Sequence, residues 1–298
     1  MKNKLKSNKI VNVSKRILPI ILLTSTLLTN TACRDNIKPE VTQKVYVEIP
    51  QYRDLSVLRN VNLPTYKDKF KGETYTFVKE KDVFAYCVEL KYAIKDYFKK
   101  YGASDWYSPE EQKFWMDNVE YVVTAIAYAE STYRTDCFNE RGCGGITGLN
   151  KQQVLETLDN WLHETAVWGK NFPDISTEDE NVDVFNPATS LEYTYYNIGY
   201  VSRVIFQKDK KFEYNGEMYC IWDNIAFSRE NQNKLIIASH LFGIGNIVDA
   251  SKGVQKDGHN IDYYLNSKYV QKVLDKTEEL KSKYISEFNL QELVEYSR

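Results

Sequence analysis

Apolar residues recur at helical spacing along much of the chain, and this pattern predicts a mainly α-helical fold. The longest pattern is 108–130, where Ser108-Pro109-Glu110-Glu111 provides a capping box and a proline at the first helical position. The core-facing stripe of this segment consists of Trp115, Val119, Val122, Val123, Ile126 and Ala127. Glu130 is the next position of the stripe, so we expect its carboxylate to lie against the core rather than in water.

The remaining elements follow from the same periodicities. We expect further helices over 82–101, 151–168, 188–206, 231–242 and from 269 towards the C-terminus. Residues 44–49 predict a strand, and 70–78 is ambiguous between helix and strand. Asn215-Gly216 within 212–222 predicts a β-hairpin, because this pair favours a two-residue turn. The expected architecture is therefore mainly α, with a small β-hairpin insertion.

The first 33 residues differ in composition from the rest. Six basic residues precede the apolar run 17–28, which is too short to span a membrane easily, and Cys33 follows it. This looks like a bacterial lipoprotein signal with cleavage before Cys33 and a lipid on its sulfur. Secretion without a lipid stays open, because Asn30 stands where a leucine is usual, and so does an uncleaved membrane anchor. We expect an exported protein, lipid-anchored in the cell envelope on the outer membrane or the cell surface.

The rest of the chain divides into two parts by composition. Residues 34–104 are polar at first, with Pro39, Pro50 and Pro64 interrupting any long element, and they predict a tether followed by an N-terminal helical segment. Residues 105–298 contain most of the helical patterns and predict the main domain. A chain of 298 residues with 43% apolar residues is long enough for a sizeable core. Its formal net charge of -2, without a basic stripe, gives no reason to expect a nucleic-acid partner.

Five cysteines become four if Cys33 carries the lipid. In an oxidising compartment the four remaining cysteines can form two disulfides in three different connectivities. Cys137 and Cys143 flank one turn, so we expect a disulfide between them, which leaves Cys87 and Cys220 as a second possible pair. Cys87 lies on an apolar stripe, so a plain buried thiol is the alternative. No metal site is expected, because paired Cys-x-x-Cys units are lacking and the three histidines are scattered.

Glu130 is the candidate catalytic residue. Burial and the negative end of a helix dipole both favour the protonated form of a carboxyl group. A carboxylic acid that keeps its proton near neutral pH suits general-acid cleavage of a glycosidic bond. The alternative is that Glu130 turns out to solvent at a fraying helix end.

The residues after this glutamate carry a family resemblance. Glu130-Ser131 is followed by Arg141-Gly142-Cys143-Gly144-Gly145-Ile146-Thr147-Gly148-Leu149. This resembles the lysozyme-like lytic transglycosylases of the soluble lytic murein transglycosylase type, in which a Glu-Ser pair ends a helix and a Gly-Leu-Met/Thr-Gln motif follows. Gly145, Ile146 and Thr147 match that motif at the family's spacing, while Gly148 replaces its glutamine.

Later segments are similar to further motifs of the family, in the family's order. Asn186-Pro187 is similar to its Asp-Pro, 238–245 to its Ala-Ala-Tyr-Asn-Ala-Gly-Pro-Gly, and 269–274 to its Tyr-Val-x-x-Val-Leu. His240-Leu241 replaces the usual Tyr-Asn pair, so this wall of the cleft is altered. The resemblance covers roughly residues 115 to 274 and implies a lysozyme-like α-helical catalytic domain.

The resemblance also implies a reaction. It implies a glycan-cleaving lyase without cofactors that acts on peptidoglycan, at the β-1,4 bond between N-acetylmuramic acid and N-acetylglucosamine. Glu130 would act as both acid and base, and the product would carry a 1,6-anhydro ring. Tyr269 would direct its hydroxyl towards Glu130, and Ser131 would orient the carboxyl or the substrate's N-acetyl group.

The turn residues receive roles by the same resemblance. Gly145 would let the sugar chain approach the backbone. Ile146 and Thr147 would line the cleft floor, and His240 would contribute to its altered wall.

Two other functions stay open. A lysozyme-type muramidase would hydrolyse the same bond, with Asp136, Glu140 or Asp174 as its second carboxylate. A catalytically inactive protein would bind the wall within a secretion or conjugation assembly, since Gly148 and His240-Leu241 depart from the family pattern.

Overall fold

The computed structural model describes residues 45–46, 54–100, 113, 117–163, 182–206, 212–214, 217–219, 228–251, 253–255 and 258–285. By its contacts the chain divides into the units Met1–Val41 and Thr42–Arg298, and every described residue belongs to the second unit. The expected signal sequence with Cys33, the capping box at 108–111, Trp115, Asp174 and Cys220 lie outside the described residues.

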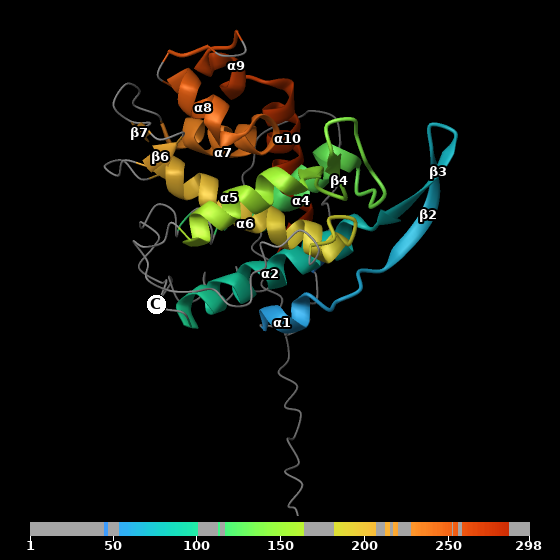
Figure 1. The fold of residues 1–298 in the computed structure, drawn as a ribbon. Helices are drawn as coiled ribbons and strands as arrows, with labels where there is room; N and C mark the ends of the chain where they lie inside the picture. Colours follow the sequence, from blue (N-terminus) through green and yellow to red (C-terminus); the bar gives the residue numbers. More distant parts are fainter. Residues whose placement is uncertain are drawn as a thin grey trace, which may run out of the picture. The chain divides into compact units, whose positions relative to one another are not determined.

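Helices dominate the described part of the chain, which confirms the mainly α prediction (Figure 1). The helices are α1 Leu55–Leu58, α2 Glu80–Lys100, α4 Val119–Ser131, α5 Lys151–His163, α6 Pro187–Phe206, α7 Arg229–Phe242, α8 Ile244–Ser251, α9 Ile261–Leu265 and α10 Lys268–Lys283. The strands are β1 Val45–Tyr46, β2 Thr65–Phe70, β3 Glu73–Val78, β4 Cys143–Gly144, β5 Leu149–Asn150, β6 Phe212–Tyr214, β7 Glu217–Tyr219 and β8 Tyr284–Ile285. The strands form four separate pairs, β1 with β8 in parallel and the others antiparallel.

Helix α4 lies at the centre of the packing. Every residue from Val119 to Ala127 is buried, including those off the predicted stripe, and α4 packs against α2, α6 and α10. A helix that is apolar on nearly all sides is one that is covered on all sides. The same hydrophobic core takes in buried residues of α2, so this helix and the later ones share one core.

The two ends of α4 differ from the predicted single helix over 108–130. Residue 117 is helical, but Asn118 has φ -143°, so the helix begins anew at Val119. At the other end Thr132 adopts a left-handed conformation, and its backbone N–H bonds back to the carbonyls of Ala127 and Tyr128. The chain therefore leaves the helix directly after Glu130 and Ser131.

Most other helices match their predicted ranges. Helices α2, α6 and α7 begin and end within two residues of the prediction, and Gly243 ends α7 as its C-cap. Helix α5 is described to His163, and the rest of its predicted range lies outside the described residues. The prediction that the chain stays helical beyond 283 is wrong, because Tyr284 turns into strand β8 and pairs with β1, which confirms part of the strand expected at 44–49.

Three antiparallel pairs of consecutive strands lie in the described residues, β2 with β3, β4 with β5 and β6 with β7, and the last of them was predicted. Strands β6 and β7 pair around Asn215-Gly216, as expected. The hairpin of β2 and β3 replaces the ambiguous segment 70–78 and projects away from the helices (Figure 1). Its turn residues Lys71 and Gly72 both have positive φ, which fits the tight turns that suit the twist of a hairpin. Near its turn the guanidinium of Arg134 lies over the rings of Phe70 and Tyr75, which ties the hairpin to the loop after α4.

A cluster of charges joins α10 to α2. Glu80 forms ion pairs with Lys276 and Lys283 and accepts a hydrogen bond from the Tyr284 hydroxyl. Burial alone would raise the pKa of Glu80, but the hydrogen bonds from the two lysines outweigh it and lower the pKa to about 2. Lys272, one turn earlier on α10, donates to the carbonyl of Ala129 at the end of α4. These contacts fix α10 beside the helix that carries Glu130.

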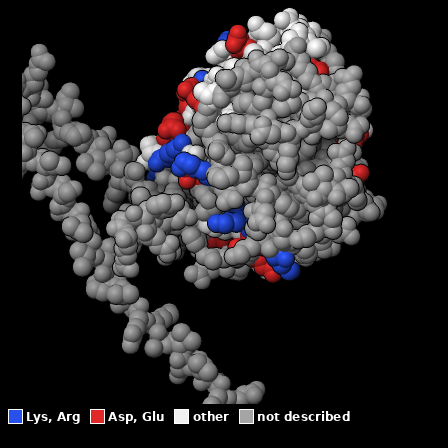
Figure 2. All heavy atoms as spheres, turned by 90° about the vertical axis from the view of Figure 1, so that its left-hand side faces the viewer, with Lys and Arg blue, Asp and Glu red and all other residues white. Residues whose placement is uncertain are grey.

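Charged residues of both signs lie close together on the described surface. On the face shown in Figure 2, lysines and arginines have acidic neighbours, in keeping with the formal net charge of -2.

Candidate functional site

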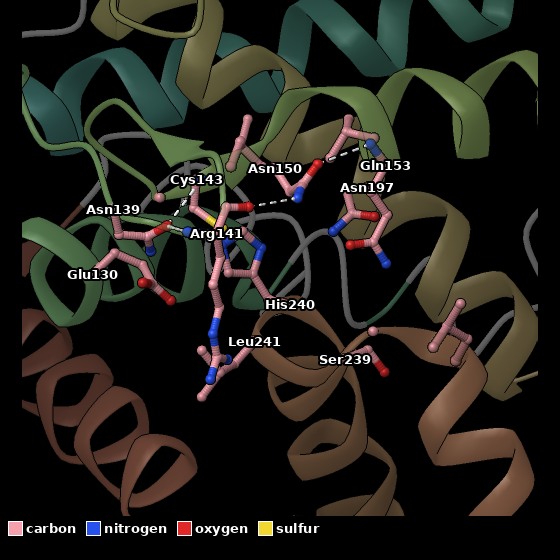
Figure 3. A pocket seen from close by; sticks show the side chains of 15 residues that line it. Glu130, Asn139, Arg141, Cys143, Asn150, Gln153, Asn197, Ser239, His240 and Leu241 are labelled. Carbon is pink, nitrogen blue, oxygen red and sulfur yellow. Dashed lines mark hydrogen bonds between the residues drawn. The ribbon is translucent and has the colours of Figure 1, made fainter. Parts of the chain in front are cut away.

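A cavity of about 250 Å³ lies beside the C-terminal end of α4 (Figure 3). Its walls come from the end of α4, the loop 139–150, the first turn of α5, α6, and the junction of α7 with α8. The polar side chains that line it include Glu130, Arg141, Asn150, Gln153, Asn197 and His240. Segments that are far apart in the sequence therefore meet around Glu130.

Glu130 lies at the edge of the core rather than against it. Residues 128–130 are half-buried, because the last turn of α4 emerges from its neighbours, and the Glu130 side chain lines the cavity. The expectation that its carboxylate would face the core is wrong in this respect. The alternative of an exposed glutamate on a fraying end does not describe it either, since the cavity encloses part of the side chain.

The backbone of Gly148 lies beside this carboxylate. A Cβ atom at Gly148 would lie 2.8 Å from Oε2 of Glu130, and the residue has φ +61°. Both the contact and the left-handed backbone exclude a side chain at this position without strain. The departure from the family's glutamine thus has a local reason, because the turn itself packs against the carboxyl group.

Glu130 is the one carboxylate among the described residues that line the cavity. Asp136 is exposed, and its Oδ2 accepts a hydrogen bond from the backbone N–H of Thr76 in the projecting hairpin at 3.0 Å. Glu140 is exposed and does not line the cavity. Of the second carboxylates considered from the sequence, these two are therefore poorly placed to act with Glu130.

Ser131 is buried and holds the loop rather than a ligand. Its side chain is inaccessible, with the residue 1% exposed, and its hydroxyl lies 2.7 Å from the carbonyl of Ile146 and 3.0 Å from that of Ala127. A hydroxyl in this position donates to backbone carbonyls and ties the end of α4 to the glycine-rich turn. The expected direct contact with substrate is replaced by a positioning role.

The turn residues 145–147 also face inward. Gly145 has φ +74°, and a Cβ there would lie 1.8 Å from the carbonyl oxygen of Val184, so its glycine serves packing rather than the approach of a sugar. Ile146 and Thr147 are fully buried, and the prediction that they line the cleft floor is wrong. The Thr147 hydroxyl instead joins those of Ser190 and Thr194 on α6, each at 2.8 Å. The turn is thus anchored on α6 and presents Gly148 to the cavity.

His240 lines the cavity, and one nitrogen of its ring has a defined hydrogen-bond partner. Its Nε2 lies 2.9 Å from the backbone carbonyl of Thr147. A carbonyl oxygen only accepts, so Nε2 carries a proton. Nδ1 is buried and has no hydrogen-bond partner among the described residues. In the neutral ring Nδ1 is therefore an acceptor without a partner among the described residues.

Tyr269 lies beside Glu130, on α10. Burial, and then the neighbouring Glu130 carboxylate, raise the pKa of Tyr269 well above the ordinary value of a tyrosine. Its hydroxyl is buried, and no described group meets hydrogen-bond geometry with it. A phenol that stays protonated is a possible hydrogen-bond donor to a neighbouring carboxylate.

Four amide side chains that line the cavity were not predicted from the sequence: Asn139, Asn150, Gln153 and Asn197. Asn139 Oδ1 accepts from the backbone N–H of Arg141 at 2.9 Å and of Cys143 at 3.1 Å. Asn150 Nδ2 donates to the Arg141 carbonyl at 3.2 Å, while its Oδ1 accepts from the backbone N–H of Gln153 and so caps α5. Asn197 comes from the middle of α6. The Asn139–Gly142 stretch carries a turn signal that could have indicated the first of them.

Cys137 and Cys143 are free thiols, so the expected disulfide is absent from the structure. The reason is the register of the loop. Phe138 forms an antiparallel bridge with Gly144, which sets Cys137 opposite Gly145 and leaves Cys143 diagonal to Cys137. Diagonal Cβ atoms in such a pair lie about 7 Å apart, whereas a disulfide needs about 4 Å. Cys87 is also free and lies buried in the core.

We expect both loop cysteines to react with a thiol reagent without prior reduction. The protein would be unfolded in denaturant with iodoacetamide and no reductant, digested, and analysed by mass spectrometry. Peptides with modified Cys137 and modified Cys143 are predicted, in the same yield as in a reduced control. A peptide pair linked through these two sulfurs would contradict the register described above.

Among all the residues that the structure describes, no group of three or more histidine, cysteine or acidic side chains comes together in a way that could hold a metal ion. No helix in the described ranges is long and apolar enough to cross a membrane. Comparison with protein-family models, with curated proteins and with solved structures finds no match to this chain.

Proposed function

We propose that this chain is a peptidoglycan lytic transglycosylase with a lysozyme-like helical domain, and that Glu130 is its single acid and base. The observation that carries the proposal is the cavity at the end of α4, in which Glu130 is the one carboxylate among the described lining residues. The motif resemblance around Glu130-Ser131 and Gly145-Ile146-Thr147 supports it from the sequence.

The proposed reaction needs one proton carrier and no water. The Glu130 carboxyl donates its proton to the glycosidic oxygen between N-acetylmuramic acid and N-acetylglucosamine as that C–O bond breaks. The carboxylate then takes the proton of the muramyl 6-hydroxyl, whose oxygen attacks C1 and closes the 1,6-anhydro ring. Glu130 is protonated again at the end, so the step balances without a second carboxylate.

The neighbours of Glu130 suit this cycle. Tyr269 offers a donor to the carboxylate form, because its hydroxyl is buried beside it and stays protonated. Gly148 packs on the carboxyl and restricts its rotation. Ser131 and Lys272 hold the end of α4 through backbone carbonyls. A group that alternates as acid and base needs such fixed geometry.

The two alternatives predict different products. A muramidase would add water at C1 and would need a second carboxylate, for which Asp136 and Glu140 are poorly placed. A non-catalytic wall-binding protein of a secretion or conjugation assembly would release nothing.

The test is mass analysis of purified peptidoglycan after incubation with the protein. Products with 1,6-anhydro ends support the proposal, reducing ends support a muramidase, and the absence of products supports the binding protein. Glu140→Gln is a matched control, since Glu140 lies in the same loop as Arg141 but outside the cavity, and this variant should release the wild-type products.

We further propose that the protein is exported and lipid-anchored through Cys33. We expect labelled palmitate to attach to the wild-type chain, and Cys33→Ala to lose the label and leave the membrane fraction. The reason is that a thioether-linked lipid requires the Cys33 sulfur, while buried acyl chains hold the protein at the bilayer. Absence of label on the wild-type protein would contradict the lipid anchor but leave secretion open.

A further inference from the structure

Arg141 lines the cavity next to Glu130 without a role in the reaction described above. Its backbone is held on both sides, since its N–H donates to Asn139 and its carbonyl accepts from Asn150. In Figure 3 its side chain extends away from the loop, and no dashed line reaches its guanidinium. Among the described residues no ion pair involves Arg141, and its guanidinium has no hydrogen-bond partner there. The loop therefore fixes the base of a cationic side chain and leaves its head available.

The charged side chains that line the cavity favour an anionic ligand. Glu130 and Arg141 line the same space but do not form an ion pair. When Glu130 carries the proton that general-acid catalysis needs, Arg141 has no opposing charge among the described lining residues. The guanidinium keeps its charge at all relevant pH values, and its fork of donors matches a carboxylate. A carboxylate on the substrate would supply the missing charge.

His240 provides a second and independent sign that this space receives a ligand. The residue lines the cavity, and its Nδ1 is buried and lacks a partner among the described residues, while Thr147 fixes the opposite nitrogen as the donor. An unpaired buried acceptor is costly unless a ligand satisfies it. The lining residues thus include a cationic donor group, Arg141, and a histidine whose acceptor nitrogen has no partner among the described residues, His240.

We propose that Arg141 determines specificity by binding a carboxylate of the glycan substrate beside the scissile bond. This inference rests on the proposed function, because it concerns the same cavity. Peptidoglycan has two sources of such a carboxylate. One is the lactyl group of muramic acid once the stem peptide has been removed, and the other is the stem peptide itself. Chitin oligosaccharides share the β-1,4 backbone and the acetamido groups but have neither source.

The experiment compares three substrates with wild-type protein and Arg141→Gln. The substrates are peptidoglycan strands with stems, the same strands after amidase treatment, and chitin oligosaccharides. We expect Arg141→Gln to lower the preference for carboxylated strands over chitin, as a ratio of kcat/KM values, by about 10-fold or more, because a charge-assisted contact is lost. The loss should appear in KM. A loss on stem-free strands identifies the lactyl carboxylate, and a loss confined to strands with stems identifies the peptide.

Two further variants and one binding measurement complete the test. Arg141→Lys keeps the charge but not the fork of donors and should show a smaller loss of preference. Lys67→Gln on the exposed strand β2 removes one positive charge outside the cavity lining and should keep the preference.

An equal fall of kcat/KM on all three substrates, or no fall, would overturn the role of Arg141 even if peptidoglycan is cleaved. If nothing is cleaved, the proposed function fails. Binding of strands with stems, stem-free strands and chitin to Glu130→Gln, with and without Arg141→Gln, then still decides the inference: a weaker preference for either kind of strand over chitin supports it, and an unchanged preference for both overturns it.

Discussion

Glu130→Gln should lower peptidoglycan cleavage by at least about 100-fold and up to about 10,000-fold, because general acid–base catalysis contributes that much and no second carboxylate shares the described part of the cavity. The amide keeps the size of the side chain and can still fit beside Gly148, but it cannot deliver a proton. Release of soluble fragments from purified peptidoglycan measures the effect.

The folding of this variant is the necessary control. Glu130 is half-buried and forms no ion pair with the described residues, so its replacement should change the free energy of unfolding by less than about 1 kcal/mol. Circular dichroism and a denaturant titration check this point. A folded Glu130→Gln protein with wild-type activity would remove Glu130 from the mechanism, whatever the fold.

Lys91→Met should destabilise the protein by about 3–5 kcal/mol, the range measured when one partner of a buried ion pair is removed. Lys91 Nζ lies 2.8 Å from Glu120 Oε1, and the two side chains are 1% and 0% exposed. Glu120 Oε2 has no hydrogen-bond partner among the described residues, so loss of the lysine would leave a buried carboxylate with little compensation. The shift of the denaturation midpoint gives the magnitude.

The double variant tests whether the ion pair itself is the cause. Lys91→Met together with Glu120→Leu removes both charges and retains similar volumes, so most of the lost stability should return. Glu120 is on α4, about 15 Å along the helix axis from Glu130, so the double variant should also keep its activity. If the double variant is less stable than both single ones, the pair is a source of stability rather than a constraint on how α2 and α4 pack.

Most helices could be predicted because the spacing of apolar residues within each segment is enough to indicate a helix. The apolar positions of 119–127 are enough to indicate α4, and Asn215-Gly216 is enough to indicate a hairpin. The position at which α4 leaves the core could not be predicted in this way. It depends on α10 and on the turn at Gly148, which come from other parts of the chain, so periodicity alone placed Glu130 too deep.

Only part of the site was predicted: Glu130 and His240 line the cavity, while Arg141 and the amide side chains were missed. Ser131 and Thr147 were expected to bind substrate, yet both are buried because their hydroxyls bind partners on other segments, Ile146 and Ser190. The pairing of Cys137 with Cys143 depended on a register that only the bridge between Phe138 and Gly144 defines. Residue types and spacing carry no information about a one-position shift in such a ladder.

The most direct test of the central claim is the fate of water during cleavage. The reaction would be run in water enriched in oxygen-18, and the masses of the released muropeptides would be measured. A single acid and base that closes the 1,6-anhydro ring predicts products lighter than the hydrolysed form by one water, with no heavy oxygen at C1. Products that carry the heavy oxygen at C1 would contradict the account, because they require a water that Glu130 alone does not activate in it.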